Sequence, residues 1–220
     1  MNFEERVTPI AEEVISALLK NKQFNNLVLN QESHSISKIE SALDDILSLY
    51  GISVSGGAER ISFLLPLEGF VIKFDWDGTF SACQREYDNY EAAAFSELSQ
   101  YFAESFPLYI GGYWFLIQEF MPSVALESEE FFEFLGNDYY ERDLYEMSDS
   151  EIYSTYEDED EEGQQFIFEK IFEKINCGAD SENFLEFLTL HSINDLHGKN
   201  FYVDFKKGIL KLIDYAGFIW

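Results

Sequence analysis

The most informative part of this sequence is the pair of motifs Asn-Asp-Leu-His-Gly-Lys-Asn (Asn194–Asn200) and Asp-Tyr-Ala-Gly (Asp214–Gly217). Between them lie the apolar stretches Phe201–Val203 and Ile209–Ile213, which are separated by a turn at Lys207-Gly208. The pattern predicts a loop that presents a carboxylate and an amide, followed by a hairpin whose second strand brings another carboxylate to the same place. Carboxylate and amide oxygens suit Mg²⁺, so the spacing favours a site for a metal bound to a phosphate chain.

This arrangement resembles the catalytic loop and metal-binding aspartate of the protein kinase-like superfamily. The resemblance implies that Asp195 is the catalytic base that accepts the proton of the substrate hydroxyl. It also implies that Asn200 and Asp214 bind Mg²⁺, with ATP as the phosphate donor. A polar hairpin with solvated acids would give the same local pattern, so residues upstream must decide between the two interpretations.

The upstream sequence contains a lysine in an apolar strand. Ser53–Phe63 predicts a glycine turn that enters an alternating strand, and Gly69–Phe74 predicts a strand that carries Lys73. Burying an unpaired ammonium costs several kcal/mol, so Lys73 needs a partner. Under the resemblance, Lys73 holds the α- and β-phosphates, and the glutamate that holds Lys73 is Glu86 in the next helical segment, with Glu91 as the second choice.

The segment Tyr113–Pro122 is an apolar strand that ends in a short polar connector. It resembles the hinge between the two kinase lobes, with Gln118 as the gatekeeper and the backbone of Glu119 and Met121 contacting the adenine edge. Taken alone, the segment is a buried strand. The order of the motifs along the chain supports the hinge interpretation, because it is the order found in kinases.

The glycine loop departs from the kinase pattern because it lacks a clean G-x-G-x-x-G. It offers Gly51 and the pair Gly56 and Gly57, and we expect that pair to contact the phosphates. In the catalytic loop, Ile-Asn-Asp (193–195) replaces His-Arg-Asp, and His197 stands where protein Ser/Thr kinases usually have lysine. These features are closer to aminoglycoside phosphotransferases and to small kinases encoded by phages.

We therefore expect an α+β protein with a two-lobed, protein kinase-like fold. Its parts are an N-terminal helical extension (1–50), a kinase-like N-lobe to the hinge (51–122) and a minimal, acidic helical C-lobe (123–220). The sequence reaches Trp220 soon after Asp214, which predicts a truncated C-lobe without an activation segment.

The chain is strongly acidic, with a net charge of −28 over 220 residues, and 46% of its residues are hydrophobic. Such a hydrophobic fraction excludes a disordered acidic tail as the whole protein. From Glu127 to Glu162 there are sixteen acids and one base, Arg142. The run Glu157–Glu162 predicts a solvated loop, and the aromatic residues before it predict amphipathic helices.

This charge predicts repulsion of nucleic acid and attraction of basic partners. A protein or a cationic small molecule is therefore the expected acceptor. Two explanations of the acids stay open: imitation of DNA to occupy a DNA-binding protein, and solubility or a salt-rich habitat.

Residues 1–50 predict two amphipathic helices. Thr8 is the expected N-cap of the first, with Pro9 at its first helical position. Ser35 or Ser37 is expected to cap the second, and Gly51 to end it. Such faces usually pack on their own domain.

Cys83 and Cys177 have no metal or disulfide spacing, and the three histidines form no metal motif. No apolar run approaches the about 20 residues of a membrane span, and Glu4-Glu5 argues against a signal peptide. A soluble protein of the cytoplasm is expected, which for a phage protein means the host cytoplasm.

The sequence thus predicts an ATP- and Mg²⁺-dependent phosphotransferase, most simply a small phage-type Ser/Thr protein kinase that acts on host proteins. The alternative is a catalytically inactive kinase-like protein whose acidic surface inhibits a basic or DNA-binding partner.

Overall fold

The computed structural model describes residues 2–29, 35–121, 175, 181–193, 200–204 and 207–215. The chain forms two compact units, the first made of residues 1–95 and 103–121 and the second of residues 96–102 and 122–220. Helices combine with a five-stranded antiparallel sheet, so the expected α+β class is confirmed. The acidic segment 127–162 lies outside the described residues.

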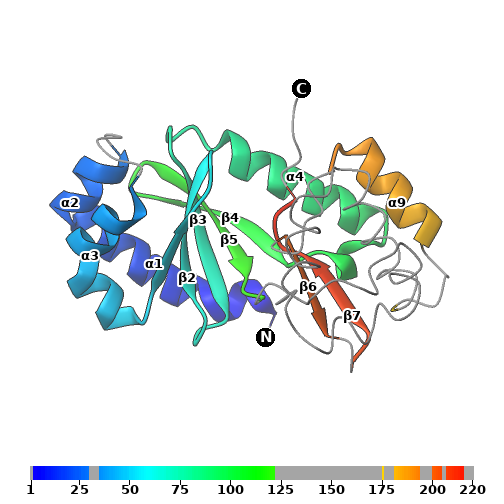
Figure 1. Ribbon diagram of the computed structural model, residues 1–220, viewed down its shortest axis with the longest axis horizontal. Helices are drawn as coiled ribbons and strands as arrows, with labels where there is room; N and C mark the ends of the chain where they lie inside the picture. Colours follow the sequence, from blue (N-terminus) through cyan, green and yellow to red (C-terminus); the bar gives the residue numbers. More distant parts are fainter. Residues whose placement is uncertain are drawn as a thin grey trace, which may run out of the picture. The chain divides into compact units, whose positions relative to one another are not determined.

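The antiparallel sheet forms the centre of the first unit, with strand order β1-β2-β3-β5-β4 (Figure 1). Its strands are β1 (Ser53–Gly56), β2 (Arg60–Leu65), β3 (Phe70–Asp75), β4 (Ser105–Ile110) and β5 (Tyr113–Glu119). The register places Ser62 of β2 and Leu116 of β5 opposite Lys73 of β3. Since β3 is the middle strand and all its residues are buried, Lys73 lies in the interior.

The helices of residues 1–50 cover one face of this sheet. They are α1 (Phe3–Lys20), α2 (Lys22–Phe24), the π-helical turn η1 (Asn25–Leu29) and α3 (Ile36–Tyr50). Alternate residues of β3, such as Phe70 and Ile72, share a hydrophobic core with Val14 of α1 and Ile39 of α3. The amphipathic faces therefore pack within their own unit, as their periodicity predicted.

The predicted start of α1 is wrong. Its N-cap is Asn2, whose side chain accepts from the Glu5 N–H at 2.7 Å, while the Asn2 N–H donates to Glu5 Oε2 at 3.2 Å. This capping box satisfies the first turn, so the helix begins before Thr8. Thr8 and Pro9 lie inside α1, where the Thr8 hydroxyl donates to a carbonyl of the preceding turn at 2.7 Å.

The boundaries of α3 agree with the sequence. Ser35 occupies the N-cap position, which decides between the two candidate serines. Gly51 ends the helix with a φ of 64°, in the left-handed region that favours glycine. Gly51 is therefore a helix cap, whereas Gly56 and Gly57 belong to the β1–β2 hairpin.

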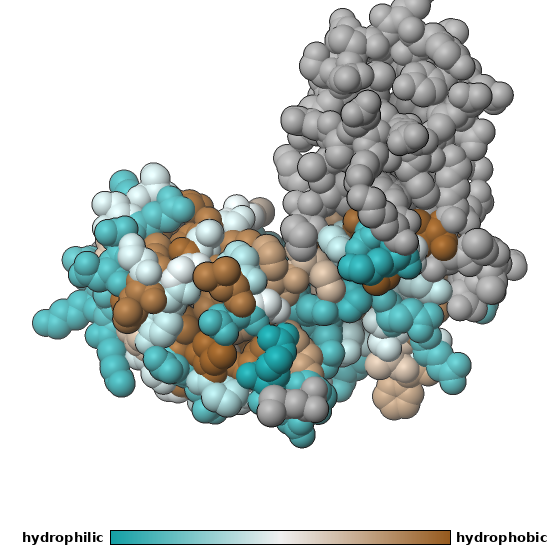
Figure 2. Space-filling view, turned by 90° about the horizontal axis from the view of Figure 1, so that it is seen from below, coloured by the Kyte–Doolittle hydropathy of each residue, from teal (hydrophilic) through white to brown (hydrophobic). Residues whose placement is uncertain are grey.

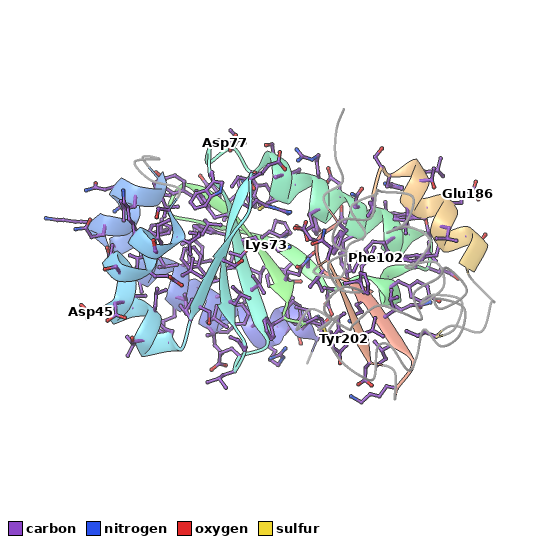
Figure 3. All side chains as sticks on the ribbon, viewed as in Figure 1. Asp45, Lys73, Asp77, Phe102, Glu186 and Tyr202 are labelled. Atoms are coloured by element: carbon purple, nitrogen blue, oxygen red, sulfur yellow. The ribbon has the colours of Figure 1, made fainter. Side chains whose placement is uncertain are left out.

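Helix α4 (Ser81–Phe95) covers the other face of the sheet. Its buried residues recur at helical spacing and are Ala82, Cys83, Glu86, Asn89 and Ala93. The facing side of the sheet is unusually polar, because it carries Lys73 (Figure 3) and Gln118 as well as apolar Leu116.

The second unit contains the short turn η2 (Ser99–Tyr101), helix α9 (Ser181–Leu190) and the hairpin of β6 (Phe201–Asp204) and β7 (Ile209–Leu212). The hairpin was predicted, including its turn, where Gly208 has a φ of 64°. The core of the second unit is aromatic, since the Phe102 ring lies 5.8 Å from that of Phe184 and 5.0 Å from that of Tyr215.

The first unit mixes apolar and hydrophilic residues on the face shown in Figure 2. Its exposed apolar side chains include Leu49 and Leu67. Within the described part of the chain, no helix is long and apolar enough to cross a membrane.

Candidate functional site

Glu86 is the centre of a buried polar cluster in the first unit. Its side chain is fully buried on α4 and accepts hydrogen bonds from three other residues. Lys73 Nζ and Gln118 Nε2 each lie 2.7 Å from Glu86 Oε1, and Arg60 Nη1 forms an ion pair with Glu86 Oε2. We call these four residues the Glu86 cluster. A buried carboxylate needs such partners, because an unpaired charge in the interior is costly.

The expected pairing of Lys73 with Glu86 is present. On β3, Phe70 and Ile72 point to the helical core, so strand alternation directs Lys73 to the α4 face. On α4, Glu86 belongs to the buried stripe. The second choice, Glu91, is exposed and accepts from the Tyr87 hydroxyl at 2.8 Å, so it is not the lysine's partner.

Two further members complete the cluster. Gln118, predicted as the gatekeeper, uses its side-chain amide to hold Glu86. Arg60 is absent from the sequence prediction, although its strand carries a signal. Because Ile61 and Phe63 enter the helical core, alternation places Arg60 on the same face as Lys73.

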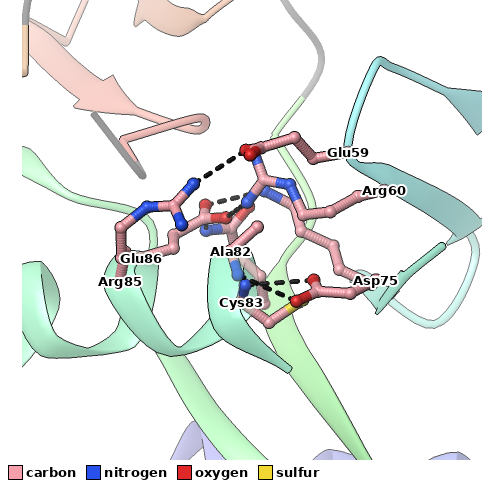
Figure 4. Close-up of polar contacts among 9 residues, drawn as sticks. Glu59, Arg60, Asp75, Ala82, Cys83, Arg85 and Glu86 are labelled. Carbon is pink, nitrogen blue, oxygen red and sulfur yellow. Dashed lines mark hydrogen bonds and ion pairs between the residues drawn. The ribbon is translucent and has the colours of Figure 1, made fainter. Parts of the chain in front are cut away.

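Asp75 fixes the helix that carries Glu86 (Figure 4). Its two carboxylate oxygens accept from the Ala82 N–H at 2.8 Å and the Cys83 N–H at 3.1 Å. Phe80, directly before the helix, has a φ of 67° and no side-chain oxygen to cap the helix. The strand that carries Lys73 therefore also caps the helix that carries Glu86.

The Cys83 thiol is buried beside this cap. Burial raises its pKa well above the ordinary value, and the charge of Asp75 raises it further. Cys83 is therefore a neutral, inert thiol, since the reactive form is the thiolate. This agrees with the absence of a metal or disulfide motif around it in the sequence.

The β1–β2 hairpin contains the glycines expected to contact phosphate. A Cβ on Gly56 would lie 2.5 Å from Ile36 Cδ1, the end of a side chain that would have to shift, and 3.2 Å from Trp76 Cζ2, so a larger residue here would crowd the contact with α3. Around Gly57 the space is open, and the Gly57 carbonyl accepts from Trp76 Nε1 at 2.9 Å. Gly57 is thus the better placed of the two for a ligand.

A second ion pair links this hairpin to α4. Arg85 Nη2 lies 2.8 Å from Glu59 Oε2, next in sequence to the Arg60–Glu86 pair (Figure 4). Arg85 Nε is buried and has no hydrogen-bond partner among the residues that the structure describes. A buried donor of this kind suits an anionic group or water.

The hinge segment continues the sheet. The Glu119 N–H donates to the Glu104 carbonyl at 2.8 Å, and the Phe120 N–H donates to the Gly69 carbonyl at 3.0 Å. Met121 follows as the last described residue of this segment. Contact of Glu119 and Met121 with adenine stays a prediction.

The two expected magnesium ligands lie together in the second unit. The Asn200 carbonyl accepts from the Ile213 N–H at 2.8 Å and the Asp214 N–H at 3.4 Å, at the open end of the β6–β7 hairpin. Next to them, Tyr215 is fully buried against Phe102 and fixes the chain after Asp214. The hairpin therefore holds the backbones of Asn200 and Asp214 side by side. Binding of Mg²⁺ by their side chains stays a prediction.

Asp195 lies outside the described residues. Within the described ranges, no group of three or more His, Cys, Asp or Glu could hold a metal ion. An ion bound by Asn200 and Asp214 would need further oxygens, which the phosphates of a nucleotide and water supply in such sites. Lys73 and Glu86 belong to the first unit and Asn200 and Asp214 to the second, so their convergence stays a prediction.

A pocket of about 420 Å³ on the first unit was not predicted. It is lined by Glu4, Tyr87, Tyr90, Glu91, Ala94, Phe95, Glu104, Ser105 and Phe106. The pKa of Tyr87 and that of Tyr90 are both raised to about 12, mainly by burial, with added effects of Glu91 on Tyr87 and Glu104 on Tyr90. The pocket is therefore aromatic and electrostatically negative.

Comparison with protein-family models, curated proteins and solved structures gives no match to this chain. The kinase resemblance consequently rests on the residues and their geometry.

Proposed function

We propose that the chain is an ATP- and Mg²⁺-dependent phosphotransferase of the protein kinase-like type, active in the cytoplasm. The buried ion pair between Lys73 of β3 and Glu86 of α4 carries this proposal. In kinases, a lysine on the third strand positions the phosphates, and a glutamate of the following helix holds it. The sequence order of the motifs predicts this contact, and Lys73 Nζ and Glu86 Oε1 lie 2.7 Å apart.

Each residue then has a definite role. Lys73, oriented by Glu86, binds the α- and β-phosphates, and Asn200 and Asp214 hold Mg²⁺, which neutralises charge on the phosphates. The oxygen of the acceptor hydroxyl forms a bond to the γ-phosphorus, and Asp195 accepts the proton that this hydroxyl loses. The bond from this phosphorus to the bridging oxygen breaks, and ADP leaves with the electron pair.

The acceptor is a hydroxyl on a basic protein or on a cationic small molecule. The net charge of −28 supports this class, because a negative field concentrates cations around the protein and repels nucleic acid. A Ser/Thr protein kinase acting on host proteins is the most specific form of this proposal.

The test uses ATP labelled at the γ-phosphate, incubated with the full chain alone and with cell lysate. We expect labelled protein or a labelled small molecule with the wild type. Asp195→Ala should abolish transfer and retain nucleotide binding, whereas Asp214→Ala should weaken Mg·ATP binding itself. Equal loss of binding in both variants would show that these roles are wrongly assigned.

The same charge favours a second candidate, an inactive kinase-like protein that inhibits a basic or DNA-binding partner. Such a protein should associate with its partner at a rate that falls steeply as salt rises. Neutralising Glu157–Glu162 should then abolish inhibition, whereas Lys73→Met and Asp195→Ala should retain it. Inhibition lost in Lys73→Met would instead favour the kinase.

A further inference from the structure

Arg60 is a member of the Glu86 cluster that the kinase resemblance does not explain. Arg60 is the first residue of β2, directly after the glycine turn, and its side chain is 11% exposed. Its guanidinium binds Glu86 Oε2, whereas Lys73 and Gln118 both bind Oε1. The two cations therefore hold Glu86 through different oxygens and do not compete for one acceptor.

We propose that Arg60 is a positioning residue that holds Glu86 in place while Lys73 binds the nucleotide's phosphates. This inference rests on the proposed function, since it assigns Lys73 to the phosphates.

The reason is charge compensation. Lys73 carries one positive charge, and phosphates that share it leave less compensation for Glu86. A fully buried carboxylate with weaker compensation moves away from Lys73, because an unpaired buried charge is costly. An arginine stays protonated at all relevant pH values, so Arg60 keeps a positive charge against Glu86 Oε2.

Arg60 also connects two elements of the site. The neighbouring pairs Arg60–Glu86 and Glu59–Arg85 both run from the β1–β2 hairpin to consecutive residues of α4. Two adjacent links fix the hairpin relative to the helix more firmly than one. The β1–β2 hairpin and Glu86 therefore keep their spacing when Lys73 also binds the phosphates.

The test compares the wild type with Arg60→Gln, Arg60→Met and Arg60→Lys in the full chain. Calorimetry measures the dissociation constant of Mg²⁺ with a non-hydrolysable ATP analogue at several pH values. Both neutral variants should bind about tenfold more weakly than the wild type, because Glu86 then lacks the charge that holds its Oε2. Arg60→Lys should restore most of the affinity.

Arg6→Gln is the matched control, because Arg6 lies on α1 and donates to the Glu68 carbonyl at 2.8 Å, outside the cluster. It should bind the analogue as the wild type does at every pH. Two neutral variants of different shape keep the test independent of how either one folds.

A lower melting temperature with unchanged affinity, or an Arg60→Lys variant that binds as weakly as the neutral ones, would assign Arg60 a merely structural role and overturn the inference. A wild type that binds no nucleotide would overturn the proposed function instead. In that case carbon-13 NMR of the Glu86 side chain in the ligand-free protein decides whether Arg60 positions Glu86. A carboxyl resonance that is unchanged in the neutral variants overturns the inference, and one that shifts or broadens supports it.

Discussion

At Glu86, one buried carboxylate binds both Lys73 and Arg60, which are almost fully buried. Glu86→Gln keeps the shape of the side chain but replaces the carboxylate of both ion pairs by a neutral amide. We expect the free energy of unfolding to fall by about 3–5 kcal/mol in chemical denaturation, because breaking a buried ion pair strands charge in the interior.

Glu91→Gln is the matched control for Glu86→Gln, since Glu91 is exposed on the same helix. Glu91→Gln should change the free energy of unfolding by no more than about 0.5 kcal/mol. Equal effects of the two variants would show that the Glu86 cluster contributes no more than a surface contact.

Tyr87 and Tyr90, which line the pocket that the sequence did not predict, make the stability of the protein depend on pH. Both have a pKa of about 12 in the folded protein, above the ordinary value of 10. As pH rises, the unfolded chain loses these protons first, so their contribution to stability is complete below pH 10 and declines between pH 10 and about 12.

Ultraviolet titration of tyrosinate checks these values when the wild type is compared with Tyr87→Phe and with Tyr90→Phe. In the Glu91→Gln variant, the Tyr87 pKa should move back toward its ordinary value. Both tyrosines ionising with ordinary pKa values in the wild type would contradict the burial and negative charge assigned to the pocket.

Individual residues of the cluster differed in how far the sequence predicted them. Lys73 and Glu86 were predictable for two reasons. A lysine in an apolar strand needs a carboxylate partner, and the kinase pattern places that carboxylate on the next helix. Arg60 was missed because its strand was interpreted from its apolar residues alone. Register was needed to show that the alternate polar positions of β2 lie opposite Lys73 and Asp75.

At the scale of elements, the β1–β2 hairpin is held against the N-terminal helices by Gly56. A Cβ there would lie 2.5 Å from Ile36 Cδ1, whereas a Cβ on Gly57 would meet nothing within 4 Å. Gly56→Ala should therefore lower the free energy of unfolding by about 1–3 kcal/mol through overpacking, and Gly57→Ala should change it by less.

Ile36→Val removes the Cδ1 methyl and supplies the partner variant for a double-mutant cycle. The decrease in the free energy of unfolding caused by Gly56→Ala should be smaller in the Ile36→Val background. Chemical denaturation of the single and double variants measures this coupling. Additive effects would show that Gly56 and Ile36 do not pack together in solution.

The element boundaries show what local sequence can and cannot decide. Gly51 and the Lys207-Gly208 turn were correctly predicted because a left-handed backbone demands glycine. Thr8-Pro9 looked like a helix start, but the capping box of Asn2 and Glu5 starts α1 earlier. Pro9 lies in the interior of α1, where it has no N–H to donate to the carbonyl of Glu5.

At the scale of the whole molecule, sequence predicted the α+β class and the packing of residues 1–50 on their own unit. It did not predict the strand order β1-β2-β3-β5-β4 or the remote capping of α4 by Asp75, because both depend on contacts between segments that are distant in sequence. The kinase-like account further requires that residues of both units bind one nucleotide.

Calorimetric titration of the full chain with Mg²⁺ and a non-hydrolysable ATP analogue tests that requirement most directly. Lys73→Met alters the first unit and Asp214→Ala the second, while Lys207→Met, at the exposed hairpin turn, serves as the control. We predict one binding site in the wild type, at least about tenfold weaker binding in each of the first two variants, and no change in the control. No binding by the wild type, or weakening by a variant in one unit alone, would contradict the account.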